Sequence, residues 1–165
     1  MGNIDILKWL KGARGQRVVL VIFVIAAIVY FMPRGEITEG TAEATSPVAL
    51  KFGEDYVILY GVAAPDPTLQ CTRDGKATPC VQAAIEELAT QVKGRTVSCQ
   101  PVRSMQFGMP FGRCSADGLD LARHMTREGW LVTALQFTDE YLADEVTARE
   151  AGIGIWATNE TAYPE

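Results

Sequence analysis

A run of sixteen uncharged residues, 18–33, divides the chain into parts of different character. As a helix it would cover roughly 24 Å, slightly less than the ~30 Å hydrocarbon core of a bilayer. The run lies between Arg17 and Arg34, whose long side chains can reach the interface and make up the difference. We therefore expect a transmembrane helix over residues 18–33, preceded by a basic leader at residues 1–17.

The charges on either side of this run predict its orientation. Basic residues precede it and acidic residues follow it, so the positive-inside rule predicts a cytoplasmic N-terminus. The rest of the chain would face outward, as a periplasmic domain on a single-pass protein of a bacterial inner membrane. A cleaved signal peptide is the alternative, because basic residues before an apolar stretch describe both cases. The small-x-small site nearby, at residues 42–44, lies well beyond the run, which disfavours cleavage.

The outward part is long enough for one domain with its own core, which we expect over residues 48–165. Residues 34–47 are rich in Gly, Thr, Glu and Ala and would form a tether or a first strand. From residue 35 onward the chain carries 10 Lys and Arg against 19 Asp and Glu. Such an acidic surface repels phosphate backbones, so nucleic acid is a disfavoured partner.

All four cysteines lie in this outward part, at positions 71, 80, 99 and 114. No two of them have the CxxC spacing, and the single histidine belongs to no cluster of metal ligands, so we expect no metal site. An oxidising compartment outside the membrane favours two disulfides. The sequence alone leaves three pairings open.

The periodicity of the outward part predicts a mixture of strands and helices. Residues 48–52 and 56–63 are β-branched and aromatic around a Gly-Glu-Asp turn and predict a hairpin. A proline-marked loop is expected over residues 64–80. Further strands are expected at residues 96–102 and 111–116, and helices at residues 81–92, 119–127 and 139–151, the last capped by Thr138.

The order of these elements and their short motifs resembles the thermonuclease-like (staphylococcal nuclease-type) family. The resemblance covers about residues 40–157 and rests on motifs at residues 57–66, 97–99, 111–113, 122–130 and 154–156. It implies a five-stranded OB-type β-barrel with three helices. The expected fold class is therefore one N-terminal transmembrane helix plus an α+β domain of this type.

Members of this family cleave phosphodiesters with one calcium ion, two arginines and a carboxylate that orients water. The resemblance places Ile58 where the first arginine is expected, and Val48 and Ala63 where calcium-binding carboxylates are expected. Asp66 stands in place of the general-base glutamate, and Arg113 is retained.

Because apolar side chains replace both metal carboxylates and one arginine, we expect no calcium site, no cofactor and no catalytic residues. The expected protein is not an enzyme but a degenerate nuclease, with Asp66 and Arg113 as remnants. Asp66 follows a proline and is expected to be a turn or cap residue. Arg113 either keeps an anion-binding role or pairs with an acidic side chain.

The resemblance also favours one pairing of the cysteines. Cys71 with Cys80 would close the loop before the first helix of the domain. Cys99 and Cys114 would lie on adjacent strands and could join them. Each bridge would add about 2–4 kcal/mol to stability.

Three classes of function follow. The preferred one is a noncatalytic accessory subunit of an inner-membrane assembly, which binds an integral membrane protein through the helix at residues 18–33 and through the barrel. The second is a membrane-bound, calcium-dependent nuclease with a rearranged site that uses Asp66 and Arg113. The third is a barrel that binds a ligand.

Overall fold

The structure is a computed structural model that describes residues 18, 20–27, 38–73, 76–102 and 110–157. The chain divides into two units, Met1–Arg34 and Gly35–Glu165. In the first unit, residues 18 and 20–27 are helical and exposed. The expected leader at residues 1–17 lies outside the described residues.

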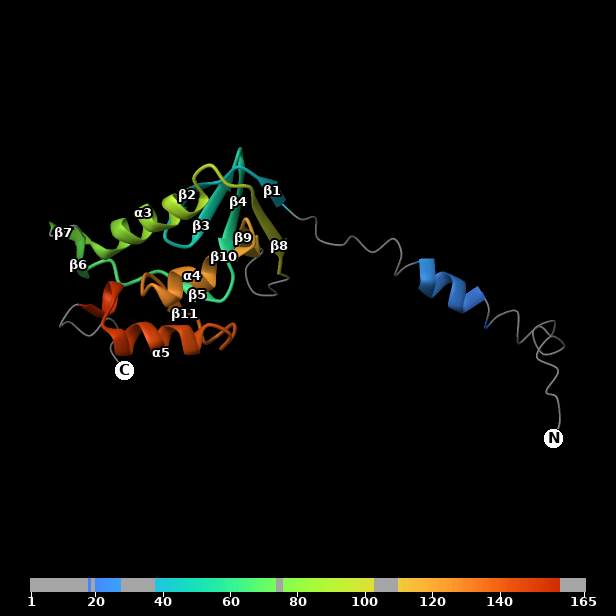
Figure 1. Cartoon of the computed structure of the whole chain (residues 1–165). Helices are drawn as coiled ribbons and strands as arrows, with labels where there is room; N and C mark the ends of the chain where they lie inside the picture. Colours follow the sequence, from blue (N-terminus) through green and yellow to red (C-terminus); the bar gives the residue numbers. More distant parts are fainter. Residues whose placement is uncertain (1–17, 19, 28–37, 74–75, 103–109, 158–165) are drawn as a thin grey trace, which may run out of the picture. The chain divides into compact units, whose positions relative to one another are not determined.

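The second unit is built on a seven-stranded sheet (Figure 1). Six of its strands run in the order β1-β8-β9-β4-β3-β2, and β10 pairs with β9. All pairings are antiparallel except that of β4 with β9, which is parallel. The strands are β1 Thr38–Gly40, β2 Glu43–Ser46, β3 Ala49–Phe52, β4 Asp55–Leu59, β8 Val97–Pro101, β9 Phe111–Ala116 and β10 Leu119–Asp120.

Helices and two small sheets complete this unit (Figure 1). One small sheet pairs β5 with β11, and the other pairs β6 with β7. These elements are α3 Cys80–Val92, α4 Leu121–Arg127, α5 Leu142–Ala151, the 3₁₀ helix η1 Gly154–Ala157, β5 Val62–Ala63, β6 Gln70–Arg73, β7 Lys76–Pro79 and β11 Val132–Thr133.

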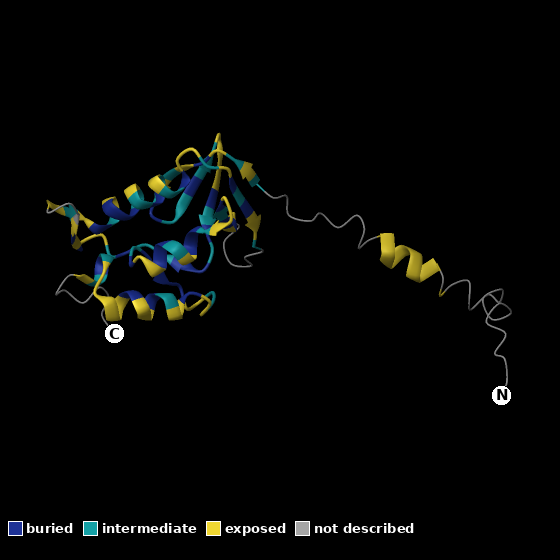
Figure 2. Ribbon diagram, viewed as in Figure 1, coloured by how far each residue is buried: buried dark blue, intermediate teal, exposed yellow. Residues whose placement is uncertain are grey.

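The core lies between the large sheet and the helices, as the buried residues in Figure 2 show. Helix α3 buries Ala84, Leu88 and Val92, which recur every four residues and so form one face of the helix. Strand β4 buries Val57 and Leu59, because alternate side chains of a strand point to the same side. Helix α5 contributes Ala148 to the interior and exposes its opposite side (Figure 2).

The predicted five-stranded barrel is wrong, because the large sheet has seven strands and does not close. Its two edge strands, β1 and β2, are consecutive in the chain and are joined by Thr41 and Ala42. The sheet therefore bends back toward its own edge. Among the described residues, no ladder of hydrogen bonds joins β1 to β2, and closure requires such a ladder.

The predicted transmembrane helix is also contradicted. In the part of the chain that the structure describes, no helix is both long and apolar enough to cross a bilayer. The continuous described helical stretch, residues 20–27, covers about 12 Å, less than half of what a bilayer requires. Residues 19 and 28–33 of the expected span lie outside the described residues.

Local predictions also need correction. The strand expected at residues 56–63 is divided into β4 and β5, and the helix expected at residues 119–127 begins at Leu121, after β10. The expected loop at residues 64–80 contains the β6–β7 hairpin, whose strands pair from Gln70 with Pro79 to Arg73 with Lys76. Helix α5 begins at Leu142, three residues later than expected. The hydroxyl of Thr138 accepts a hydrogen bond from the backbone N–H of Glu140, so it stabilises a turn before the helix.

Candidate functional site

The three positions where apolar side chains replace the expected catalytic groups lie in the sheets or in a turn between two strands. Val48 lies in the turn between β2 and β3, and its carbonyl accepts a hydrogen bond from the backbone N–H of Leu59. Ile58 lies on β4, opposite Ala49 on one side and Phe111 on the other. Ala63 lies on β5 and pairs with Val132.

These side chains cannot hold calcium, because that ion requires six to eight oxygen ligands and they supply none. Nor does any group of three or more His, Cys, Asp and Glu residues within the described ranges have an arrangement that could hold a metal ion. The side chains at these positions therefore do not fit the calcium ion that the resemblance implies.

Asp66 is part of a turn. One oxygen of its carboxylate accepts hydrogen bonds from the backbone N–H of Thr68 at 2.8 Å and from the Thr68 hydroxyl at 2.6 Å. The bond from the hydroxyl, followed by the bond from the backbone, lowers the pKa of Asp66. Asp66 therefore stays ionised at neutral pH and stabilises its own turn, as Asp commonly does.

Arg113 extends from β9 to the surface. Its guanidinium lies 4.8 Å from the centre of the Tyr60 ring and donates a hydrogen bond of 2.7 Å to Oε2 of Glu140. The side chain of Arg113 is 45% exposed, so a solute can still reach it. The hydrogen bond to Glu140 raises the pKa of Arg113, which keeps the guanidinium charged.

A second guanidinium approaches the same carboxylate. Nη2 of Arg123, on α4, lies 3.7 Å from Oε1 of Glu140, and its Nη1 donates a hydrogen bond of 2.7 Å to Asp144. The carbon at the centre of this guanidinium lies 5.4 Å from the centre of the Tyr141 ring. Arg113 and Arg123 thus converge on the two oxygens of Glu140. We call Arg113 and Arg123 the arginine pair.

The side chains of the two expected remnant residues, Asp66 and Arg113, do not contact each other. Asp66 contacts Thr68, whereas Arg113 contacts Glu140 and Tyr60. Sequence analysis singled out Arg113 but missed Arg123 and Glu140. Glu140 lies 27 residues after Arg113, and no local spacing rule links residues that far apart.

Polar groups lie beside Arg113. A cavity of about 180 Å³ beside Arg113 is lined by hydroxyl, amide and carboxylate groups, among them those of Ser98, Gln100, Ser115 and Asp120. The serine hydroxyls and the Gln100 amide can both donate and accept hydrogen bonds, whereas the Asp120 carboxylate accepts them. The cavity therefore offers a polar solute further contacts next to the Arg113 guanidinium.

Tyr141 lies beneath Arg123 and is completely buried. Within the described residues, its hydroxyl has no hydrogen-bond partner. Burial, followed by the negative charges of Asp120 and Glu140, raises the pKa of Tyr141 to about 12. The phenol therefore stays neutral at physiological pH.

The cysteines form the two expected disulfides. Cys71 of β6 is joined to Cys80, the first residue of α3, and Cys99 of β8 is joined to Cys114 of β9. The second pair is directly opposite in the antiparallel register of the two strands. Both disulfides are buried and therefore act in the framework of the domain.

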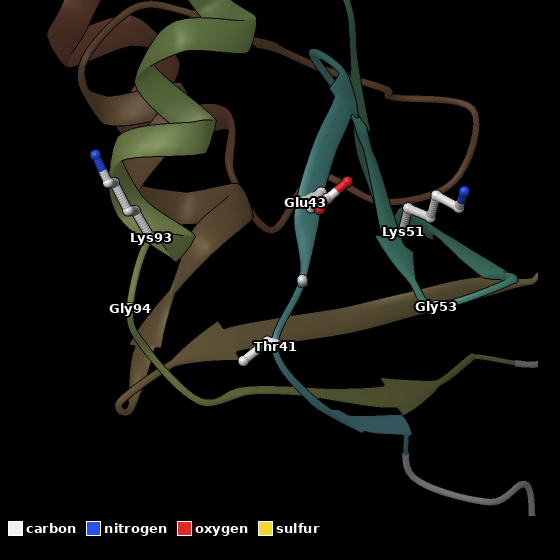
Figure 3. Close-up of a pocket in the computed structure, with 7 residues that line it drawn as sticks. Thr41, Glu43, Lys51, Gly53, Lys93 and Gly94 are labelled. Carbon is white, nitrogen blue, oxygen red and sulfur yellow. The ribbon is translucent and has the colours of Figure 1, made fainter.

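A larger cavity, of about 540 Å³, lies between the end of α3, the start of β2 and the β3–β4 turn. Figure 3 shows Lys93 on one side of it and Lys51 on the other, with their ammonium groups directed away from each other. Charged groups must converge to hold an anion, so this cavity is a weaker candidate than the arginine pair.

Comparison with known proteins gives one distant relative and no family. No family model matches the chain. The chain is 28% identical over 129 residues to a protein of Schizophyllum commune that is named probable endonuclease LCL3. The match covers 67% of this chain and 44% of that protein, so the chain spans less than half of the relative's length.

This relative is consistent with the resemblance to nucleases, and it contradicts one prediction. The expectation that the chain is not an enzyme conflicts with the name of the relative, which assigns that protein a nuclease activity. The chain is therefore related, distantly, to a protein named a probable endonuclease.

Proposed function

We propose that the second unit acts on phosphodiesters and binds their phosphate through Arg113 and Arg123. The observation that carries this proposal is the convergence of two guanidinium groups on one carboxylate at distances of 2.7 and 3.7 Å. A guanidinium presents a planar fork of N–H donors that matches the oxygens of a carboxylate and of a phosphate alike. A pair of them can also stabilise the charge that develops on a phosphate during its transfer.

The charge of the domain limits the kind of substrate. The part of the chain from residue 35 onward carries 19 acidic against 10 basic residues, so a long duplex would be repelled over most of the surface. A short single strand meets only the local field of the arginine pair. We therefore propose short single-stranded nucleic acid as the substrate.

A cleavage assay with the full-length chain tests this proposal. Short single-stranded DNA and RNA are incubated with the wild type, with Arg113→Ala and with Arg127→Ala. Arg127 is another exposed arginine, on α4, and serves as the matched control. Parallel reactions contain either calcium or a chelator. They test whether cleavage depends on calcium, which the side chains of Val48, Ile58 and Ala63 cannot bind.

We expect the wild type to cleave in both conditions. We expect Arg113→Ala to lower the rate by about 10²–10³, the usual effect of removing one preorganised donor. Arg127→Ala should retain the wild-type rate. Absence of cleavage and of oligonucleotide binding by the wild type would reject the proposal. An equal loss of cleavage rate in Arg113→Ala and Arg127→Ala would also reject it.

A second candidate function rests on the first unit. Its described helical residues are apolar and exposed, from 42% for Val18 to 72% for Phe23. Exposed apolar side chains in such a run indicate an interaction surface. We propose that this stretch binds the domain to a membrane-bound assembly as an accessory subunit, with the domain on the periplasmic side.

This second candidate has its own test. A tag after Glu165 allows the full-length chain to be extracted in mild detergent and its partners to be identified. Phe23→Asp should release the chain from the membrane fraction, whereas Tyr56→Asp, at another exposed aromatic residue, should not. Equal membrane retention of the wild type and Phe23→Asp would reject this candidate.

A further inference from the structure

We infer that Glu140 is an internal competitor at the arginine pair, so that a phosphate must displace its carboxylate in order to bind. This inference rests on the proposed function and concerns the regulation of the same site. Glu140 bonds to Arg113 at 2.7 Å and lies 3.7 Å from Arg123, which is the position that an oxyanion shared by the two guanidinium groups would take.

The Glu140 carboxylate forms an ion pair with each member of the arginine pair. It is anionic and planar and carries two acceptor oxygens, and each guanidinium approaches one of them, as two guanidinium groups could approach two oxygens of one phosphate. Asp144 already neutralises part of the charge of Arg123 through its own hydrogen bond of 2.7 Å. With Glu140 in place, two positive groups are matched by two negative groups, and the attraction for an external anion is reduced.

The position of Glu140 in the fold allows displacement without unfolding. Its side chain is 32% exposed, so solvent reaches it. Its backbone N–H donates to the hydroxyl of Thr138, and α5 begins two residues later, at Leu142. The backbone is thus held while the side chain can rotate into water. Exposed ion pairs contribute little, which makes an exchange of one anion for another inexpensive.

A binding experiment with matched charge changes tests this inference. The full-length wild type, Glu140→Gln and Asp139→Asn are titrated with inorganic phosphate and with short oligothymidylate, and Kd is measured by calorimetry. Asp139 is an exposed neighbour, and Asp139→Asn removes the same formal charge as Glu140→Gln. The two variants therefore differ in whether the lost carboxylate contacts the arginine pair.

We expect Glu140→Gln to bind both probes more tightly than the wild type, by up to about fivefold, the upper limit that an exposed ion pair implies. Asp139→Asn should gain less than half of that, since it changes only the general field. The gain should disappear in Glu140→Gln/Arg113→Ala and should shrink at high salt, where surface charges are screened.

The outcomes separate this inference from the proposed function. If the wild type binds oligothymidylate in a manner that depends on Arg113, but Glu140→Gln binds no more tightly than Asp139→Asn, the inference is overturned and the proposed function stands. If neither the wild type nor Glu140→Gln binds either probe, both are rejected. Tighter binding of oligothymidylate but not of phosphate by Glu140→Gln would also overturn the inference, because displacement of the carboxylate should favour any phosphate.

Discussion

The carboxylate of Glu145 on α5 accepts a hydrogen bond of 2.6 Å from the backbone N–H of Thr133 on β11. Both residues are buried. The other oxygen of Glu145 accepts a bond of 2.9 Å from Arg149, one helical turn later. This acidic residue therefore attaches α5 to the small β5–β11 sheet, next to the segment that carries Glu140.

We predict that Glu145→Ala lowers the free energy of unfolding by about 2 kcal/mol, because the buried N–H of Thr133 would lose a charged acceptor. Glu150→Ala, at an exposed position on the same helix, should change it by less than about 0.5 kcal/mol. Urea denaturation of the two variants checks this. Equal effects would show that the bond to Thr133 contributes nothing specific.

Two glycines with the same backbone conformation should respond differently to substitution. Gly53 and Gly154 both have φ near +61°. A Cβ at Gly53 would meet no atom within 4 Å, whereas a Cβ at Gly154 would lie 2.2 Å from the carbonyl oxygen of Gly129.

We therefore predict a loss of about 1–2 kcal/mol for Gly53→Ala, from the left-handed backbone alone. Gly154→Ala should lose about 1–3 kcal/mol more, because the backbone around Gly129 must shift. Thermal unfolding of both variants measures the difference. A Tm for Gly154→Ala equal to that of Gly53→Ala would show that this crowding is relieved at no cost.

Elements with a clear periodicity were predictable from sequence. The β3–β4 hairpin was predicted from β-branched and aromatic residues around a Gly-Glu-Asp turn, and α3 from apolar residues at helical spacing, among them Leu88 and Val92. The open sheet was not predictable, because closure depends on whether strands β1 and β2 form hydrogen bonds with each other. Periodicity within each strand carries no information about that.

The candidate site was only partly predictable for the same reason. Arg113 was singled out from its motif, but its partner Glu140 is distant in sequence and lies in the turn before α5. That turn was expected to be helical, which would have directed Glu140 differently. Arg123 reaches Glu140 because α4 lies against both α5 and β9, an arrangement that follows from tertiary packing.

The two disulfides should stabilise the domain to similar extents. The Cys71–Cys80 bridge spans 9 residues of sequence and Cys99–Cys114 spans 15. Loop-closure entropy predicts about 2.6 and 3 kcal/mol, respectively. Unfolding in urea of Cys71→Ala/Cys80→Ala and Cys99→Ala/Cys114→Ala, each compared with the wild type, measures both. Reduction of both bridges should lower the free energy of unfolding of the wild type by more than either double substitution does. A smaller effect of the reductant would contradict a structural role for both bridges.

Stability should fall at alkaline pH because of Tyr141. Its pKa is about 12 in the folded protein and about 10 in an unfolded chain, so the folded state binds the proton more tightly. The resulting contribution is fully present below pH 10 and is lost as the pH rises to about 12. Two pKa units correspond to about 2–3 kcal/mol.

Tyr141→Phe isolates this contribution. At neutral pH the variant should be as stable as the wild type or slightly more stable, because the buried hydroxyl that it removes has no partner among the described residues. Between pH 10 and 12 its free energy of unfolding should decline less than that of the wild type by about 2–3 kcal/mol. Tyr56→Phe, at a ring that is 50% exposed, should follow the wild type. Parallel pH profiles for Tyr141→Phe and the wild type would mean that the Tyr141 phenol ionises as readily in the folded domain as in the unfolded chain.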